Sequence, residues 1–206
     1  MAANRKGARV RATAAEIVDA VVNAGRSLDA TIELNENKVA ADDRSLLRHL
    51  CFGSIRHHWR LREWAGQLVD RPIRQRDSVI AALLDVGLFQ LSGTRIPAHA
   101  AVSQTVEAAR LLRRPALAGL LNAVLRRFVR DEMAESEPVS AEARYNHPDW
   151  IIAAIRKDWP DDWQDVLTAN DERAPLWLRA NAARGNAQNY LDRLSSAGTG
   201  ASAFAG

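Results

Sequence analysis

Basic side chains gather in two stretches of the chain that could bind phosphate groups. The first stretch, residues 2–12, has four cations and no acidic residue: Arg5, Lys6, Arg9 and Arg11. The second stretch, GLLNAVLRRFVR (residues 119–130), has three cations: Arg126, Arg127 and Arg130. Such cations contact the phosphate backbone of nucleic acids, and the first stretch has no aromatic residue on which a base could stack. The alternative for both stretches is a solvated surface without a ligand.

Cysteine, histidine and aspartate side chains offer other chemistry, but structural roles explain them better. Cys51 could act as a thiolate nucleophile. It falls on an apolar helix face without a basic partner, however, which favours a buried structural role. Zinc could bind near His49, His57 and His58, but adjacent residues of a helix point about 100° apart. The carboxylates of residues 158–165 suit helix starts better than a magnesium site. We therefore predict no catalytic and no metal-binding residue.

Apolar residues at helical spacing predict the elements that carry the two basic stretches. Six of them recur every three or four positions along the second stretch: Leu117, Leu120, Leu121, Val124, Leu125 and Phe128. This pattern predicts a helix that buries one face and turns Arg126 and Arg130 away from it. The first stretch is predicted to be a mobile arm. A helix should follow from about residue 14, with Thr13 as its N-cap and Glu16 completing a capping box.

Most of the remaining sequence up to residue 130 is also predicted to be helical. Asp42 or Asp43 should cap a helix whose buried face includes Cys51, and Gly53 within it should let another helix approach closely. After a kink, the helical pattern of apolar residues continues over residues 59–69. VIAALLDVGLFQL (residues 79–91) is apolar nearly all round, which is typical of a helix in the centre of a bundle. A further helix is expected over residues 98–112. Since no strand pattern precedes residue 170, we predict an all-α bundle.

The rest of the chain is predicted to form a short, incomplete α/β segment. Residues 131–144 read as a linker or a short solvated helix, and residues 147–171 suggest two helices. Five apolar residues should pack these two helices together: Trp150, Ile151, Ile155, Trp159 and Trp163. PLWLRAN (residues 175–181) is predicted to be a strand. Residues 186–198 are predicted to form a helix that ends at Gly198. The predicted organisation is a helical domain over residues 1–132, a linker over residues 133–145 and a joining segment over residues 146–206.

Positive charge is concentrated in the first part of the chain. Residues 1–130 have 21 lysines and arginines against 12 acidic residues, whereas residues 131–206 have 7 against 13. This division predicts that the first part meets an anionic partner and favours a nucleic acid. A single cysteine suits a reducing compartment, and no apolar run approaches the roughly 20 residues that span a bilayer. We expect a cytoplasmic protein that does not enter the membrane.

Four segments resemble NusB-like RNA-binding domains, in the same order along the chain. They are DDRSLLRHLCFG (residues 42–53), LLDVGLFQL (83–91), IPAHAAVSQTVEAAR (96–110) and GLLNAVLRRF (119–128). Beyond them, HPDW (147–150) and ANDERAPLWLRAN (169–181) resemble the segment that joins such a domain to the catalytic domain of bacterial small-subunit ribosomal RNA cytosine-5 methyltransferases. The resemblance implies a NusB-like helical bundle whose arginine-rich N-terminus takes part in RNA contacts.

The resemblance also implies a function, that of an RNA-binding module of a ribosomal RNA methyltransferase, with ribosomal RNA as the expected partner. In that family a following α/β domain binds S-adenosylmethionine and carries two cysteines. The chain has no segment of this kind, so we expect it to be truncated before the catalytic domain, to hold no cofactor and to be inactive by itself. The alternatives are a free-standing transcription antitermination factor that binds RNA and a ribosomal protein, or a bundle that binds only proteins. The target nucleotide and the oligomeric state stay open.

Overall fold

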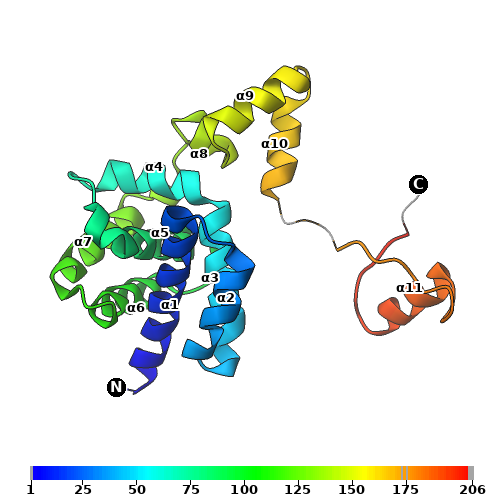
Figure 1. Cartoon of the computed structure of the whole chain (residues 1–206), viewed down its shortest axis with the longest axis horizontal. Helices are drawn as coiled ribbons and strands as arrows, with labels where there is room; N and C mark the ends of the chain where they lie inside the picture. Colours follow the sequence, from blue (N-terminus) through cyan, green and yellow to red (C-terminus); the bar gives the residue numbers. More distant parts are fainter. Residues whose placement is uncertain (1, 173, 175, 204–206) are drawn as a thin grey trace. The chain divides into compact units, whose positions relative to one another are not determined.

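The computed structural model describes residues 2–172, 174 and 176–203, and for residues 2–5 it describes the backbone alone. The chain forms two compact units, residues 1–171 and residues 172–206. The first unit contains these α-helices: α1 (Ala2–Ala24), α2 (Leu28–Asn35), α3 (Arg44–Arg56), α4 (His58–Leu68), α5 (Ser78–Gly93), α6 (Ala98–Leu111), α7 (Ala118–Arg130), α8 (Ala141–Tyr145), α9 (Asp149–Asp158) and α10 (Trp163–Asp171). The second unit contains α11 (Ala187–Ser196). The helical fold class is therefore confirmed (Figure 1).

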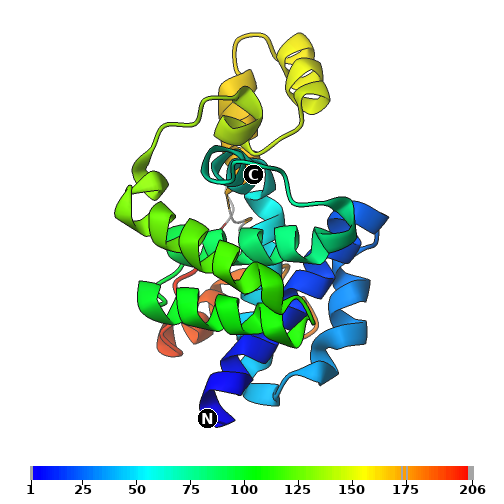
Figure 2. The same cartoon turned by 90° about the vertical axis from the view of Figure 1, so that its left-hand side faces the viewer.

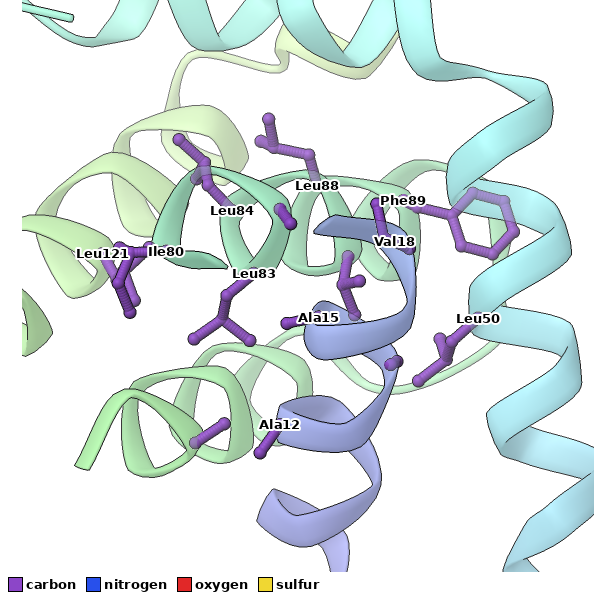
Figure 3. Close-up of a cluster of buried hydrophobic side chains, with 14 of the residues drawn as sticks. Ala12, Ala15, Val18, Leu50, Ile80, Leu83, Leu84, Leu88, Phe89 and Leu121 are labelled. Atoms are coloured by element: carbon purple, nitrogen blue, oxygen red, sulfur yellow. The ribbon is translucent and has the colours of Figure 1, made fainter. Parts of the chain in front are cut away.

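The core of the first unit surrounds α5, as the apolar sequence of this helix predicts. All side chains of residues 82–90 are buried, and α1, α3, α4, α6 and α7 pack against this helix. Figure 3 shows buried side chains that four of these helices contribute to the core: Leu83 comes from α5, Ala15 from α1, Leu50 from α3 and Leu121 from α7. Within the described residues, no helix is both long and apolar enough to cross a membrane.

The first helix begins at Ala2, so the predictions of a mobile arm and of a helix start near residue 14 are wrong. Thr13 lies in the middle of α1 and is buried, which means that it is not an N-cap. Several buried residues of this segment are small: Ala8, Val10 and Ala12. At Gly7, a Cβ atom would lie 2.6 Å from Oε1 of Gln104 in α6. The small residues thus allow α1 to pack closely, although their composition resembles that of a flexible tail.

Two further details of the bundle concern α2 and α3. The helix α2, which has 8 residues and buries Thr31 and Ile32, was not predicted from the sequence, because so short a helix shows little periodicity. Asp43 occupies the N-cap position of α3 as expected, but its side chain makes no capping hydrogen bond. The prediction for Gly53 is confirmed, since a Cβ atom there would clash with the ring of Phe89 from α5.

Residues 131–171 continue the first unit with three helices, of which α9 and α10 are the predicted pair. The region before them contains the short helix α8, whose N-cap Ser140 accepts a hydrogen bond from the amide of Ala143 at 3.1 Å. The packing predicted for Trp150 and Trp159 is wrong, because they are 72% and 56% exposed. Trp163 instead packs on the ring of Tyr145, with 5.2 Å between the ring centroids.

The second unit confirms one predicted element and contradicts another. α11 forms as expected, and Gly198 follows it with a φ of +73°. The predicted strand is wrong for residues 176–181, which adopt no regular structure, and Pro175 lies outside the described residues. A strand needs hydrogen bonds from a neighbouring strand, and the described part of the chain has none.

Candidate nucleic-acid interface

The exposed face of α7 carries the basic side chains of the second stretch. Leu121, Val124, Leu125 and Phe128 are buried on the opposite face, so the periodicity places the arginines correctly. Nε of Arg127 lies 3.2 Å and Nε of Arg130 lies 2.9 Å from carboxylate oxygens of Asp131. The hydrogen bond from Arg130, assisted by that from Arg127, lowers the pKa of Asp131, which therefore stays ionised. One carboxylate thus compensates two of the arginines only in part.

Arg126 is the third cation of this face, and its nearest partner is neutral. Its Nε donates a hydrogen bond to Oδ1 of Asn122 at 3.0 Å. No carboxylate among the described residues forms a salt bridge with Arg126. Because Asn122 only orients the guanidinium group and does not neutralise it, a full positive charge remains available to a ligand.

A pocket of about 370 Å³ lies where α7 meets the beginning of α6. Its lining consists of Ala98, His99, Val102, Arg126, Val129 and Arg130. In the first turn of α6 the amide of Ala100 already donates to the carbonyl of Pro97 at 2.9 Å. The amides of the first two helical positions have no acceptor within the helix, and the helix dipole adds positive potential there. The residue before α6 is Pro97, whose side chain offers no capping acceptor. The pocket therefore combines two guanidinium groups with the positive end of a helix, which suits a phosphate group.

His99 and the start of α6 were not identified as functional from the sequence. The sequence signal was Pro97 immediately before a helix, which marks a helix start without a side-chain cap. That signal by itself does not indicate a site, because many helices begin in this way. Only the packing of α6 against α7 brings the helix start next to Arg126 and Arg130.

The cations of the first stretch lie on α1 and differ strongly in exposure. Arg9 is exposed and has no salt-bridge partner within the described residues. Lys6 is exposed and lies 3.4 Å from Oδ2 of Asp43. The side chain of Arg5 is not among the side chains that the structure describes. Two exposed cations, Lys6 and Arg9, therefore remain as candidate phosphate contacts on this helix.

Arg11 is 5% exposed, which speaks against its predicted RNA contact. Its Nε donates to Oε1 of Gln90 at 2.8 Å, and its Nη1 donates to the carbonyl of Gly7 at 3.2 Å. Burial lowers the pKa of Arg11, and the negative charge of Asp43 partly opposes this effect. Sequence spacing did not reveal the burial because the predicted arm had no assigned helical face. We assign Arg11 to the packing of α1 against α5.

The two groups of cations occupy different helices, α1 and α7. Both helices pack against α6. In Figure 2 these are the blue ribbon of α1 and the green ribbons of α6 and α7. The candidate interface consequently consists of two separate basic groups, and the pocket belongs to the group on α7. Separate groups of this kind can contact an extended polyanion at several phosphates.

Buried titratable groups of the bundle have structural environments. Cys51 is fully buried, and burial raises the pKa of its thiol to about 12, so it is not a reactive thiolate at neutral pH. Asp85, which was not singled out from the sequence, is fully buried on α5, with one carboxylate oxygen 3.1 Å from Nε of Arg62. Burial raises the pKa of Asp85 to about 7, and the charge of Arg62 opposes the rise.

His58 lies beside this carboxylate but does not form an ion pair with it at neutral pH. Its Nδ1 is 3.8 Å from Asp85, and burial, helped by Arg62, lowers its pKa to about 4. Among the described residues, no three histidine, cysteine or carboxylate side chains are placed to share a metal ion.

Comparison with known proteins yields two family matches. Residues 8–130 match the NusB family, and residues 147–205 match the ferredoxin-like domain described as Methyltr_RsmF/B-like. The chain is 41% identical over 190 residues to the ribosomal RNA small subunit methyltransferase B of Vibrio vulnificus strain YJ016, covering 91% of this chain and 45% of that protein. It is 40% identical over 189 residues to the protein of the same name from Yersinia pseudotuberculosis strain IP 31758, covering 91% and 44%. The chain thus spans less than half the length of these relatives.

Proposed function

Because this chain belongs to the NusB family over residues 8–130, we propose that its helical bundle is the RNA-binding module of a small-subunit ribosomal RNA methyltransferase. The names of the two relatives support the assignment to such an enzyme. The observation that carries RNA binding is the pocket between α6 and α7, where Arg126 and Arg130 meet the start of a helix. The activity of the full-length protein, with S-adenosylmethionine as methyl donor and the cytoplasm as its location, is part of this proposal.

The proposed contacts are with RNA phosphates. Arg126, Arg127 and Arg130 on α7 and Lys6 and Arg9 on α1 supply the exposed cations. Guanidinium groups donate two parallel hydrogen bonds to phosphate oxygens, which gives strong contacts that do not depend on sequence. The module would therefore hold and orient ribosomal RNA, whereas recognition of the target base would fall to other parts of the enzyme. Arg5 remains a proposed contact, and Arg11 is left out because it is buried.

The proposed division of the chain is a helical domain over residues 1–132, a linker over 133–145 and a joining segment over 146–206. The two family matches, 8–130 and 147–205, support this division. In the structure, the linker and the helices up to residue 171 belong to the same compact unit as the bundle. The family matches therefore divide the chain between residues 130 and 147, whereas the packing divides it after residue 171.

A free-standing antitermination factor that binds RNA and a ribosomal protein is the second candidate. The NusB match taken alone suits either function. The match over residues 147–205 favours the methyltransferase, because this segment belongs to a domain described for methyltransferases.

RNA binding can be tested by fluorescence anisotropy with a labelled fragment of small-subunit ribosomal RNA at a series of salt concentrations. The variant Arg126→Ala/Arg130→Ala should bind more weakly and should reduce the slope of log affinity against log salt by about 1.4, which is roughly 0.7 for each lost phosphate contact. The control Arg26→Ala/Arg74→Ala removes the same charge from exposed positions in the connections between other helices. Equal slopes for the two variants would refute the proposed site, and undetectable binding by the unmodified chain would refute RNA binding itself.

A further inference from the structure

The second unit has a net positive charge, although residues 131–206 taken together are acidic. Residues 131–171 contain 11 acidic and 3 basic residues, whereas residues 172–206 contain 2 acidic and 4 basic residues. The acidic character of the C-terminal part therefore belongs to α8, α9, α10 and their connections, and the last 35 residues are basic. A polyanion would be repelled by the former segment and attracted by the latter.

Three arginines of residues 172–206 line one pocket of about 410 Å³. Its charged side chains are Arg179, Arg184 and Arg193, and its polar lining also includes Asn181, Asn189 and Tyr190. All of these belong to the second unit, so the pocket is complete within residues 172–206. Arg179 and Arg184 precede α11 in the sequence, and Arg193 lies within this helix. Figure 1 labels α11.

None of the three arginines has an acidic partner among the residues that the structure describes. This differs from the first unit, where many exposed arginines are paired: Arg48 with Glu36, Arg110 with Glu107 and Arg114 with Asp77. Like charges that line one pocket repel one another unless an anion neutralises them. The pocket thus holds uncompensated positive charge, which points to an anionic ligand.

Local hydrogen bonds order the backbone of the turn before α11 and of its first turn. The carbonyl of Asn181 accepts a hydrogen bond from the amide of Arg184 at 2.8 Å, and its side-chain Oδ1 accepts one from Ala183 at 3.0 Å. Asn186 caps α11, with its Oδ1 accepting from the amide of Asn189 at 2.8 Å. The turn before α11 and the first turn of the helix are therefore ordered by their own side chains. Less conformational entropy is lost when a ligand binds to such a site.

We propose that Arg179, Arg184 and Arg193 form a second phosphate-binding site, which binds the phosphodiester backbone of single-stranded RNA. The proposal rests on the proposed RNA-binding function and extends it to a separate part of the chain. The carboxamides of Asn181 and Asn189 can donate and accept hydrogen bonds with base edges, and a tyrosine ring can stack on a base. The mixture of guanidinium, amide and phenol groups therefore suits a nucleotide strand better than an isolated inorganic phosphate.

The test uses the full chain and a fluorescent 12-nucleotide oligouridylate as a single-stranded probe. The triple variant Arg179→Ala/Arg184→Ala/Arg193→Ala should reduce the slope of log affinity against log salt by about 2, which is roughly 0.7 for each phosphate contact. Because the three side chains are exposed, the variant leaves no cavity in the protein interior. The control is Arg144→Ala/Arg156→Ala/Lys157→Ala, which removes three exposed cations from the acidic segment and should leave the slope nearly unchanged.

Four outcomes separate this site from the proposed function. A reduced slope for the triple variant but not for its control, together with ultraviolet crosslinks from the probe to residues 176–194, supports the site. If the triple variant keeps the slope while Arg126→Ala/Arg130→Ala loses it, the bundle binds RNA and the second site is refuted. If neither variant changes the slope of a chain that binds the probe, both sites are refuted. Competition by inorganic phosphate as strong as competition by unlabelled oligouridylate, at equal phosphate concentration, would also overturn the assignment to an RNA strand.

Discussion

Charged residues in the interior of the bundle show how burial changes the role of a side chain. Arg11 and Asp85 both carry charges that the sequence would place on a surface, yet both are buried near α5. Each is held by a polar partner from another position, Gln90 for Arg11 and Arg62 for Asp85. Buried charges of this kind are tolerated only with such partners, so losing either member of a pair should affect stability more than RNA binding.

Arg11→Ala should lower the free energy of unfolding by about 1–3 kcal/mol, because it removes the hydrogen bond to Gln90 and leaves a buried acceptor without its donor. Urea unfolding followed by circular dichroism measures the change. The control Arg9→Ala alters an exposed cation of the same helix and should change stability by less than about 0.5 kcal/mol. If the two variants were equally stable, the assignment of Arg11 to the core would be wrong.

Asp85 should make the bundle less stable as the pH rises from about 4 to about 7. The unfolded carboxyl loses its proton near pH 3.9, whereas the buried one keeps it up to a pKa of about 7. The stability contributed by the protonated folded form is thus complete below the unfolded pKa and is lost between these two values, by at most about 1.4 kcal/mol per pH unit. Asp85→Asn should remove this dependence. We would measure the difference in unfolding free energy between variant and wild type at pH 5 and pH 8, and a constant difference would contradict the raised pKa.

At the scale of the elements, close approach between helices depends on glycines whose absent side chain makes room for a neighbour. Gly53 in α3 faces the ring of Phe89 from α5. Gly119 in α7 is different, because a Cβ atom at that position would meet nothing within 4 Å. Both residues lie in helices, so their intrinsic helix propensities are equal and only the packing distinguishes them.

Gly53→Ala should destabilise the protein by about 1–3 kcal/mol, since the added methyl group overpacks the contact with Phe89. Gly119→Ala should instead stabilise it by up to about 1 kcal/mol through better helix propensity. Thermal melts of the two variants test this opposition. Adding Phe89→Leu to Gly53→Ala should recover part of the loss. A stabilising Gly53→Ala would show that the two helices do not pack as closely as the structure indicates.

At the scale of the whole molecule, a polar contact region on α4 joins residues 131–171 to the bundle within the first unit. The carboxylate of Glu63 accepts hydrogen bonds from the amides of Val139 and Ser140 at 2.9 and 2.7 Å. Nε of Arg60 donates to the carbonyl of Ala143 at 3.1 Å, and the indole of Trp64 donates to Oγ of Ser136 at 3.2 Å. These contacts explain why the compact unit extends beyond the family boundary to residue 171.

Glu63→Ala should release residues 133–145 from α4 while leaving the helical core intact. Partial burial by itself would raise the pKa of Glu63, but the hydrogen bonds from Val139 and Ser140 and the charge of Arg60 hold it below the ordinary value, so the carboxylate is ionised at neutral pH. Limited proteolysis should cut the variant within this segment earlier than the wild type. Glu135→Ala removes an exposed carboxylate nearby and serves as the control. Equal cleavage of both variants would show that the Glu63 contacts do not hold the segment.

The helical content, the central position of α5 and the exposed arginine face of α7 were determined by the sequence itself. Each depends on local periodicity, which reports burial whenever a helix has a defined apolar face. The four NusB-like segments likewise predicted the family, because they occur in the expected order along the chain. The part of α1 that precedes Thr13 was not predicted, since a face made of alanine and glycine has little hydrophobic contrast with a solvated tail.

Only the tertiary structure decided which charged residues are available to a ligand. Arg9 and Arg11 are two positions apart on α1, and the packing of this helix against α5 exposes the first and buries the second. The pocket beside Arg126 exists because α6 begins next to the end of α7, a long-range contact that no local pattern encodes. In the same way, residues 176–181 have the composition of a strand but need a neighbouring strand to become one. Local sequence determines which conformations are favoured, whereas contacts between distant segments determine which of them form and which side chains remain exposed.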